Sequence, residues 1–278
     1  MVDLVAAGAV RKMKVQLASP VQYTMLLGEH EIPLNQFLGK PLQLHFQGTI
    51  NCLHCHRKTK KSFNQGYCFP CFTRLAQCDS CIVSPQKCHF AAGTCREPAW
   101  GEQHCMVDHI VYLANTSGLK VGITRGSQVP TRWMDQGATQ ALPIFRVSTR
   151  LHSGLVESLF KAHVADKTQW QAMLKGSAVD CDLEQARRRL MVDCADELEA
   201  LLQEHGLQAI SELPDQTETT IQYPVMEYPV KVSSFNVDKT PLVEGTLLGI
   251  KGQYLMFDTG VINMRKYGGY QMTLRSRG

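Results

Sequence analysis

The sequence predicts a multidomain α+β protein, and three observations support that fold class. Two Cys-x-x-Cys pairs stand twelve residues apart in a region with little apolar periodicity, which is typical of a zinc-ribbon-like segment. Both ends of the chain alternate polar and apolar residues like strands, and the middle mixes strand and helix signals. The expected parts are a strand-rich segment at 13–50, a cysteine-rich zinc-binding region at 51–107, an α/β domain at 108–178, a helical connector at 179–214 and a strand-rich segment at 215–278.

The N-terminal part contains two predicted strands. Lys14–Leu17 and Leu42–Phe46 each alternate polar and apolar side chains, as strands with one buried face do. The apolar run Leu4–Val10 is too short to span a membrane and has no basic residues before it, so it is neither a spanning helix nor a signal peptide. We expect residues 1–12 to form a loose tail ahead of Met13.

The C-terminal part returns to strands. Val243–Ile250 and Gln253–Phe257 are separated by the turn signal Lys251-Gly252, and Asp258-Thr259-Gly260 predicts a further turn. Each strand-rich end is small, and marginal sheets gain stability from additional strands. We therefore expect the two ends to meet in one β-barrel.

The strongest motif is the set Cys52, Cys55, Cys68 and Cys71. Each Cys-x-x-Cys turn presents two thiolates to one tetrahedral ion, and two such turns complete a closed shell. A redox dithiol or unrelated thiols are the alternatives, and the coincidence of two pairs at zinc spacing disfavours both. A closed shell of four sulfurs leaves no position for substrate, so this zinc ion is expected to be structural.

A second group of thiols follows and predicts a second zinc ion. We expect Cys81, Cys88, Cys95 and Cys105 to hold it, with Cys78 or a nearby histidine (His89 or His104) as the alternate ligand. The same thiols suit an iron–sulfur cluster. The spacing alone does not choose between these shells.

Charge is distributed unevenly. The chain has 44% hydrophobic and 19% charged residues with a formal net charge of +4, which is ordinary for a globular protein. Residues 52–77 contain five Lys or Arg and no acid, residues 251–278 are also basic, and residues 180–218 are mostly acidic. Either basic region could face a phosphate backbone, or could be an ordinary solvated surface. Without a signal peptide we expect a cytoplasmic protein, where clustered thiols bind metal more often than they form disulfides.

The central domain begins with a predicted hairpin. His109–Asn115 and Leu119–Thr124 form its strands, and the loop Thr116–Gly118 ends in a glycine suited to a positive φ. This register pairs residue 113 with 121 and residue 112 with 122. One face then carries Val111, Leu113, Val121 and Ile123, which suits a core, and the other carries Tyr112, Lys120, Gly122 and Thr124.

Helices and one more strand follow the hairpin. We expect a short helix at Pro130–Gln136 ended by Gly137, a strand at Ile144–Arg150, and a helix from Gly154 with Leu155, Val156, Leu159 and Phe160 on its apolar side. Residues 183–205 predict one amphipathic helix ended by Gly206, with an apolar stripe of Leu183, Ala186, Leu190, Cys194, Leu198 and Leu201.

In this order of elements, residues 108–175 resemble the GIY-YIG endonuclease superfamily, especially its short phage and bacterial domains. The Val111-Tyr112 strand resembles the first signature, and Lys120-Val121-Gly122 resembles the second. Arg132 and Glu157 match the catalytic arginine and the metal-binding glutamate, and His163 falls where that branch often has a histidine. The whole chain also looks like an uncharacterised bacterial family that joins a zinc-binding segment to this domain.

The resemblance implies metal-dependent phosphodiester hydrolysis. Glu157 would hold magnesium or manganese, Arg132 would neutralise charge on the phosphorane, and Tyr112 would orient or deprotonate the attacking water. Lys120 stands where the second signature usually has a tyrosine. A protonated amine there suits phosphate binding better than proton abstraction.

The leading functional hypothesis is a zinc-containing protein that binds DNA or RNA and cleaves it. The residues expected to contact nucleic acid are Arg57, Lys58, Lys60, Lys61 and Arg125. The alternative is a zinc-stabilised adaptor without chemistry, which binds nucleic acid or protein on a degenerate nuclease fold. A small-molecule or protein-modifying activity on the same scaffold has no specific residue in its favour.

Overall fold

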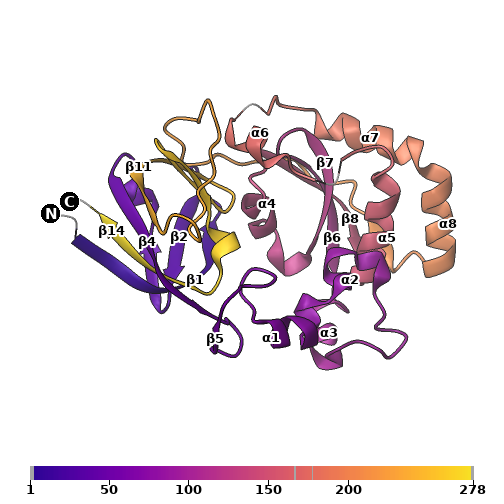
Figure 1. The fold of residues 1–278 in the computed structure, drawn as a ribbon. Helices are drawn as coiled ribbons and strands as arrows, with labels where there is room; N and C mark the ends of the chain where they lie inside the picture. The colour runs from indigo at the N-terminus through magenta and orange to yellow at the C-terminus, as the bar shows by residue number, and fades with distance from the viewer. Residues whose placement is uncertain (1–2, 166, 177, 277–278) are drawn as a thin grey trace. The chain divides into compact units, whose positions relative to one another are not determined.

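The computed structural model describes residues 3–165, 167–176 and 178–276 (Figure 1). The chain forms two compact units. One comprises Met1–Thr73, Leu174–Gly176 and Ile221–Gly278, and the other comprises Arg74–Met173 and Ser177–Thr220. Mixed α and β content and two antiparallel sheets agree with the predicted fold class. In the described part of the chain, no helix has the length and apolarity that a membrane crossing requires.

The first unit is built on a nine-stranded antiparallel sheet with the order β13-β12-β11-β4-β14-β1-β2-β3, and β5 pairs with β4. Strands from both ends of the chain therefore share one sheet, as expected. The sheet strands are β1 Asp3–Gln16, β2 Gln22–Leu27, β3 His30–Pro33, β4 Pro41–Asn51, β5 Lys58–Thr59, β11 Leu242–Lys251, β12 Tyr254–Phe257, β13 Gly260–Asn263 and β14 Tyr270–Ser276. The helical turns are η1 Asn35–Phe37, α1 Phe69–Arg74 and η5 Met264–Tyr267.

The expectation of a loose tail before Met13 is wrong. Strand β1 begins at Asp3, and its first half pairs with β14 while its second half pairs with β2. The run of Ala and Gly residues at 6–9 hides the polar–apolar alternation that would have revealed this strand. These small residues let the chain pass close to its neighbour, because a Cβ on Gly8 would stand 2.5 Å from the backbone nitrogen of Gly28.

One side chain shows that the large sheet is curled. Strand β1 has a register shift between Arg11 and Lys14, and the Gln253 amide fills it by accepting from Met13 N (3.0 Å) and donating to Met13 O (3.3 Å). Gln253 belongs to the turn between β11 and β12, four strands from β1 in the sheet order. A flat sheet would separate β12 and β1 by about 19 Å. The sheet therefore bends back on itself, and its closure into a barrel remains a prediction.

The second unit contains a five-stranded antiparallel sheet with the order β10-β8-β6-β7, and β9 also pairs with β8. Its strands are β6 His109–Asn115, β7 Leu119–Arg125, β8 Gln140–Val147, β9 Ile210–Glu212 and β10 Thr219–Thr220. The α-helices are α2 Ser80–Val83, α3 Pro98–His104, α4 Thr131–Asp135, α5 Arg150–Phe160, α6 Trp170–Leu174, α7 Leu183–Asp193 and α8 Ala195–His205. Short 3-10 turns are η2 Ala76–Cys78, η3 Pro85–Lys87 and η4 Gly126–Gln128.

The predicted hairpin is confirmed in its register. Leu113 pairs with Val121 and Tyr112 pairs with Gly122 across β6 and β7, and Gly118 in the loop has φ +137°. The face expected to be apolar packs into the core, since Val111, Leu113 and Val121 are fully buried there. The hairpin thus fixes Tyr112 on the opposite face of the sheet.

Two predicted boundaries after the hairpin are wrong. Strand β8 covers Gln140–Val147 and runs through Pro143, whereas we expected a strand at Ile144–Arg150. The proline is tolerated because it lies at a register shift against β6 and between the stretches of β8 that pair with β10 and β9. Helix α5 begins at Arg150, four residues earlier than expected, because Thr149 caps it by accepting from His152 N.

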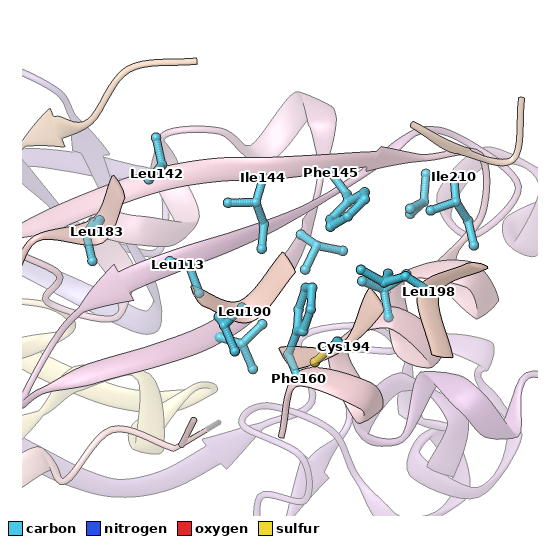
Figure 2. Packing of buried hydrophobic residues seen from close by; sticks show 14 residues of the cluster. Leu113, Leu142, Ile144, Phe145, Phe160, Leu183, Leu190, Cys194, Leu198 and Ile210 are labelled. Carbon is cyan, nitrogen blue, oxygen red and sulfur yellow. The ribbon is translucent and has the colours of Figure 1, made fainter. Parts of the chain in front are cut away.

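The core of this unit lies between the sheet and helices α5, α7 and α8. Figure 2 shows Phe145 of β8 near Phe160 of α5, whose ring centroids are 6.0 Å apart, with Cys194 and Leu198 in the same cluster. The predicted apolar stripe at 183–201 is confirmed, but the single helix is not. The helix breaks at Cys194, which ends α7 in a non-helical conformation and starts α8. Without proline or glycine at the break, the periodicity alone gave no sign of it.

The buried His109 makes stability depend on pH. Burial lowers the pKa of His109 to about 4, although its Nδ1 lies 2.7 Å from Val107 O. Above pH 6.5 the imidazole is neutral in both folded and unfolded chains, so it contributes nothing. Below pH 6.5 the unfolded chain binds a proton at this imidazole and the folded chain does not. The free energy of unfolding therefore falls until about pH 4.

We predict that the free energy of unfolding of the wild type falls by roughly 3 kcal/mol more than that of His109→Gln between pH 6.5 and pH 4. Urea unfolding at a series of pH values measures this difference. Parallel curves for the two proteins would contradict the assignment of His109 as a neutral buried imidazole.

Candidate functional site

The first candidate site is the four-cysteine cluster of the first unit. The sulfurs of Cys52, Cys55, Cys68 and Cys71 lie within 4.8 Å of one another, and Cys55 Sγ is 3.6 Å from Cys68 Sγ. Three of the four thiols are buried. Four converging sulfurs at this separation fit a tetrahedral zinc ion, which has Zn–S bonds of about 2.3 Å. The cluster is therefore compatible with a zinc site, as the sequence predicted.

The local backbone brings these thiols together in two turns. After Cys52 the chain reverses through His56, whose φ is +59°, and His56 N donates to Cys52 O. The second pair sits where helix α1 begins, with Cys68 just before it and Cys71 inside it. Residues 52–71 form a turn, a short strand and one helical turn, and we call this segment the knuckle.

The environment of the thiols favours loss of a proton at one of them. Burial alone would raise the pKa of Cys52, but hydrogen bonds from the backbone N–H groups of Cys55, Cys68 and His54 together outweigh burial and lower the pKa to about 6. Burial and hydrogen bonds with its neighbours raise the pKa of Cys71 to about 12. A zinc ion needs all four thiolates, so its binding releases protons from the other thiols.

The knuckle carries the basic side chains that the sequence singled out. Arg57, Lys58, Lys60 and Lys61 are all exposed. The knuckle also meets the C-terminal basic stretch. A Cβ on Gly268 would stand 2.1 Å from Gln65 O, Ser62 Oγ donates to Gly268 O, and Arg265 donates to Gln65. Two basic regions that are about 200 residues apart in the sequence are thus in contact.

One exposed aromatic side chain of the knuckle was missed from the sequence. Phe69 is 58% exposed beside the knuckle lysines, and its ring packs edge-on against Phe63, which lies under Lys61 Nζ. In such a place the lysines supply positive charge, and the exposed phenyl ring is a group on which a planar ring can stack. We call the exposed side chains Arg57, Lys58, Lys60, Lys61, Lys266 and Phe69 the knuckle surface.

Lys251 does not belong to any basic surface. It is 1% exposed, and its Nζ lies 5.3 Å and 5.5 Å from the ring centroids of Tyr223 and Tyr228. Burial lowers the pKa of Lys251 to about 8. The sequence places Lys251 in the basic C-terminal stretch, but in the fold its ammonium group lies between two tyrosine rings.

The second candidate site is the polar face of the hairpin in the second unit. Tyr112 is fully buried, and its ring lies against Gly122, where a Cβ would stand 2.7 Å from Tyr112 Cζ. The Gln136 amide lies 3.0 Å from Tyr112 Oη. With its nitrogen toward that oxygen, its carbonyl accepts from Arg132 Nη2 (3.1 Å) and Nε (3.2 Å). Gln136 therefore links Tyr112 to Arg132, a role that only its spacing four residues after Arg132 could have suggested.

Glu157 approaches the same place from α5. Its side chain is 12% exposed and pairs with Lys161 at 3.2 Å. Burial raises the pKa of Tyr112 to about 12, the Arg132 charge opposes this shift, and the Glu157 charge adds to it. Arg132 from α4 and Glu157 from α5 thus both act electrostatically on Tyr112 of β6, and the tyrosine keeps its proton at neutral pH.

Three other residues that the sequence singled out lie apart from this group or at different depths. Lys120 shares the hairpin face with Tyr112 but is only 4% exposed. Arg125 is half-buried at the far end of β7, opposite His109. His163 is exposed after α5 and lines a different pocket, which also includes Cys181 and Arg189. Trp133, which follows Arg132 and was expected to be a core residue, is buried against Tyr112.

The second cysteine group surrounds a small cavity in the second unit. Cys81, Cys88, Cys95 and Cys105 all line it, together with Asp79 and His89. The ligand atoms of Asp79, Cys81 and His89 lie within 4.8 Å of one another. Cys78 is buried but is not among the residues that line the cavity.

A family model described as "Protein of unknown function (DUF2797)" matches residues 39–272, most of the 278 residues of the chain. The chain belongs to the DUF2797 family. The match covers both cysteine groups of this DUF2797 protein, its hairpin and the residues that carry Arg132 and Glu157. No curated protein and no solved structure matches the chain.

The contact between Tyr112 and Gly122 in this DUF2797 protein makes a sharp prediction. We expect Gly122→Ala to destabilise the fold by about 1–3 kcal/mol, because the buried tyrosine ring has no room to yield. Gly126→Ala is the control, since its nearest neighbour would be Asp108 O at an ordinary 3.6 Å. Urea unfolding measures both variants. Equal stability of the two would show that the ring does not need the glycine.

Proposed function

We propose that this chain binds nucleic acid through its knuckle surface and hydrolyses phosphodiester bonds at the hairpin face of its GIY-YIG-like domain. The observation that carries the proposal is the convergence of Tyr112, Arg132 and Glu157 from three separate elements. A phenol, a guanidinium and a carboxylate are the groups that the resemblance assigns to cleavage, and they occur here in the expected order along the chain.

Each residue has a task that its surroundings support. Arg132 presents a fixed positive charge for the scissile phosphate, held by its two bonds to Gln136. Tyr112 keeps its proton, so it orients water or phosphate by donating a hydrogen bond and does not act as a base. Glu157 offers the carboxylate for magnesium or manganese, which binds through one or two carboxylates plus substrate phosphates. A divalent ion bound there supplies Lewis-acid polarisation of the phosphate.

A specific observation favours the alternative of an adaptor without chemistry. Glu157 is engaged by Lys161, and Tyr112 and Lys120 are buried, so substrate would have to displace one ion pair and approach a closed face. Under this alternative the zinc knuckle and the basic surface remain the functional parts. Nucleic-acid binding is common to both hypotheses, and cleavage separates them.

The zinc ion of the knuckle has the same task in both hypotheses. The knuckle contains few buried apolar residues, so a zinc ion would hold its turns and thereby fix the exposed lysines. The curled sheet that supports the knuckle is proposed to close as a β-barrel. Close packing of Gly268 and Gly269 against the knuckle backbone supports a fixed position of the knuckle on this sheet.

Binding is tested by reversing charge on the knuckle surface. We expect Lys60→Glu combined with Lys61→Glu to weaken binding of DNA and RNA oligonucleotides and to lower the slope of log affinity against log salt by about 2. Fluorescence anisotropy of labelled oligonucleotides across a salt series measures both effects. Lys231→Glu with Lys239→Glu changes the same charge at exposed positions of the same unit and is the matched control.

The outcomes are distinct. A loss of affinity in the knuckle variant alone supports the proposal. An equal loss of affinity in both double variants would show that binding depends on net charge alone and not on the knuckle surface. Absence of binding by the zinc-loaded wild type to both DNA and RNA would contradict the enzyme and the nucleic-acid adaptor together.

A further inference from the structure

We propose that the cavity lined by Cys81, Cys88, Cys95 and Cys105 binds a second zinc ion through these four thiolates, and that this ion fixes the position of helix α5. The metal site itself is independent of the proposed cleavage. Only the importance of placing Glu157 rests on the proposed function.

The size of the cavity suits a single ion. Its volume is about 10 Å³, the room of about one water molecule, which suits a single ion better than a multi-atom iron–sulfur cluster. Its lining residues come from four short segments, and the other thiols act electrostatically on Cys81 and Cys105. Four thiols around a space for one ion are the ligand set of a structural zinc. In this structure the ligand atoms within 4.8 Å of one another are those of Asp79, Cys81 and His89, so the four sulfurs would draw together as the ion binds.

The nearby carboxylate of Asp79 and imidazole of His89 are already engaged by other protein groups. Asp79 Oδ2 is held by Arg96 Nε at 2.7 Å, and Asp79 Oδ1 caps α2 by accepting from Ser80 N. His89 Nε2 lies 3.5 Å from Asp79, and its Nδ1 lies 2.8 Å from Thr94 Oγ1. Both groups therefore fit an outer layer around the ion, where a carboxylate and hydrogen-bonded partners steady the ligands. The ligands that remain are the thiols.

The segments that carry these thiols are the ones that hold α5. Arg150, the first residue of α5, donates from its backbone nitrogen to Cys105 O (2.8 Å) and from Nη2 to Ile82 O, next to Cys81. A Cβ on Gly154 would stand 2.6 Å from Gln86 N, so α5 lies directly on the turn η3 that precedes Cys88. The Arg150 charge also acts on Cys81 and Cys105 and would offset the negative charge of a four-thiolate shell.

The consequence for Glu157 follows from helix geometry. Glu157 lies seven residues after Arg150, about two turns along α5. If the ion is removed, the contacts at Arg150 and Gly154 lose their support, and the carboxylate loses its fixed position relative to Tyr112.

Metal content tests the site directly. Elemental analysis of the full chain, expressed with zinc, is expected to give two zinc ions for the wild type and one for Cys81→Ser with Cys95→Ser. The control Cys78→Ser removes a buried thiol of the same region that does not line the cavity, and it should keep both ions. One zinc in the wild type, iron in place of zinc, or two ions in the Cys81→Ser, Cys95→Ser variant would overturn the proposal.

Hydrogen exchange tests the link to α5. Amides of 150–160 should lose protection in the Cys81→Ser, Cys95→Ser variant and keep it in Cys52→Ser with Cys55→Ser. Equal protection of α5 in both variants would overturn the link while leaving the metal count intact. If the variant does not fold, titration of the metal-free wild type with Co²⁺ decides: saturation of thiolate–cobalt absorption at two ions per chain supports the second site, and saturation at one refutes it.

Discussion

Replacing Cys52 and Cys55 with serine is expected to remove one zinc ion per chain and to unfold the knuckle. Serine has nearly the shape of cysteine but is not a zinc ligand in such shells, so the change isolates the loss of metal. Zinc binding to structural sites in small zinc-finger peptides is worth about 10–16 kcal/mol at neutral pH, and residues 52–71 have little apolar core to replace it. Elemental analysis and hydrogen exchange over 52–71 measure the result.

A control variant and a second region of the protein separate loss of the metal from damage to the fold. Cys181→Ser removes a half-buried thiol outside both cysteine groups and should change neither zinc content nor exchange in the knuckle. The curled sheet should keep its protection in the Cys52→Ser, Cys55→Ser protein, because its hydrogen bonds do not involve the thiols. Full zinc content in the double variant would contradict the four-sulfur shell.

Replacing Glu157 with glutamine is expected to lower the cleavage rate at least about 100-fold while leaving nucleic-acid affinity nearly unchanged. The amide keeps the shape of the side chain but loses the charge that would hold a divalent ion and act on the site of Tyr112 and Arg132. Lys161, whose side chain is 32% exposed, stays solvated after the pair is broken, so the change costs little stability. Single-turnover cleavage and anisotropy, measured on the same preparations, give the two quantities.

The matched control is Glu184→Gln. Glu184 pairs with Arg187 on α7 at 2.8 Å, so it is also an ion-paired helical glutamate of the same unit. Its helix packs on the apolar face of the sheet, opposite the face of Tyr112, so its loss should leave cleavage intact. Equal cleavage by wild type and Glu157→Gln would remove Glu157 from the proposed site.

The sequence predicted those features that are written in short-range patterns. The Cys-x-x-Cys spacing gave the first cluster, and the hairpin register followed from alternation and the Gly118 loop. The apolar stripe at 183–201 was correct because helical periodicity survives a one-residue break at Cys194. The strand β1 escaped notice because Ala and Gly carry almost no polarity signal.

Long-range contacts explain what the sequence could not provide. Gln253 reads as a polar residue beside a turn, yet its amide fills a register shift in β1 from 240 positions away. Lys251 looks like surface charge, yet it lies between two tyrosine rings. The joining of the knuckle to residues 265–269 likewise depends on two glycines whose partners are distant in sequence. These contacts depend on which strands meet, and local patterns do not encode that choice.

The central claim is that this DUF2797 protein binds and cleaves nucleic acid, and one reaction tests it most directly. Zinc-loaded wild type is incubated with supercoiled plasmid and with labelled structured RNA, in magnesium, in manganese and without divalent metal, alongside Glu157→Gln. The proposal predicts metal-dependent nicks or cuts by the wild type that the variant does not make. Stable binding to DNA or RNA with no cleavage under any condition would contradict the enzyme and leave the zinc adaptor in its place.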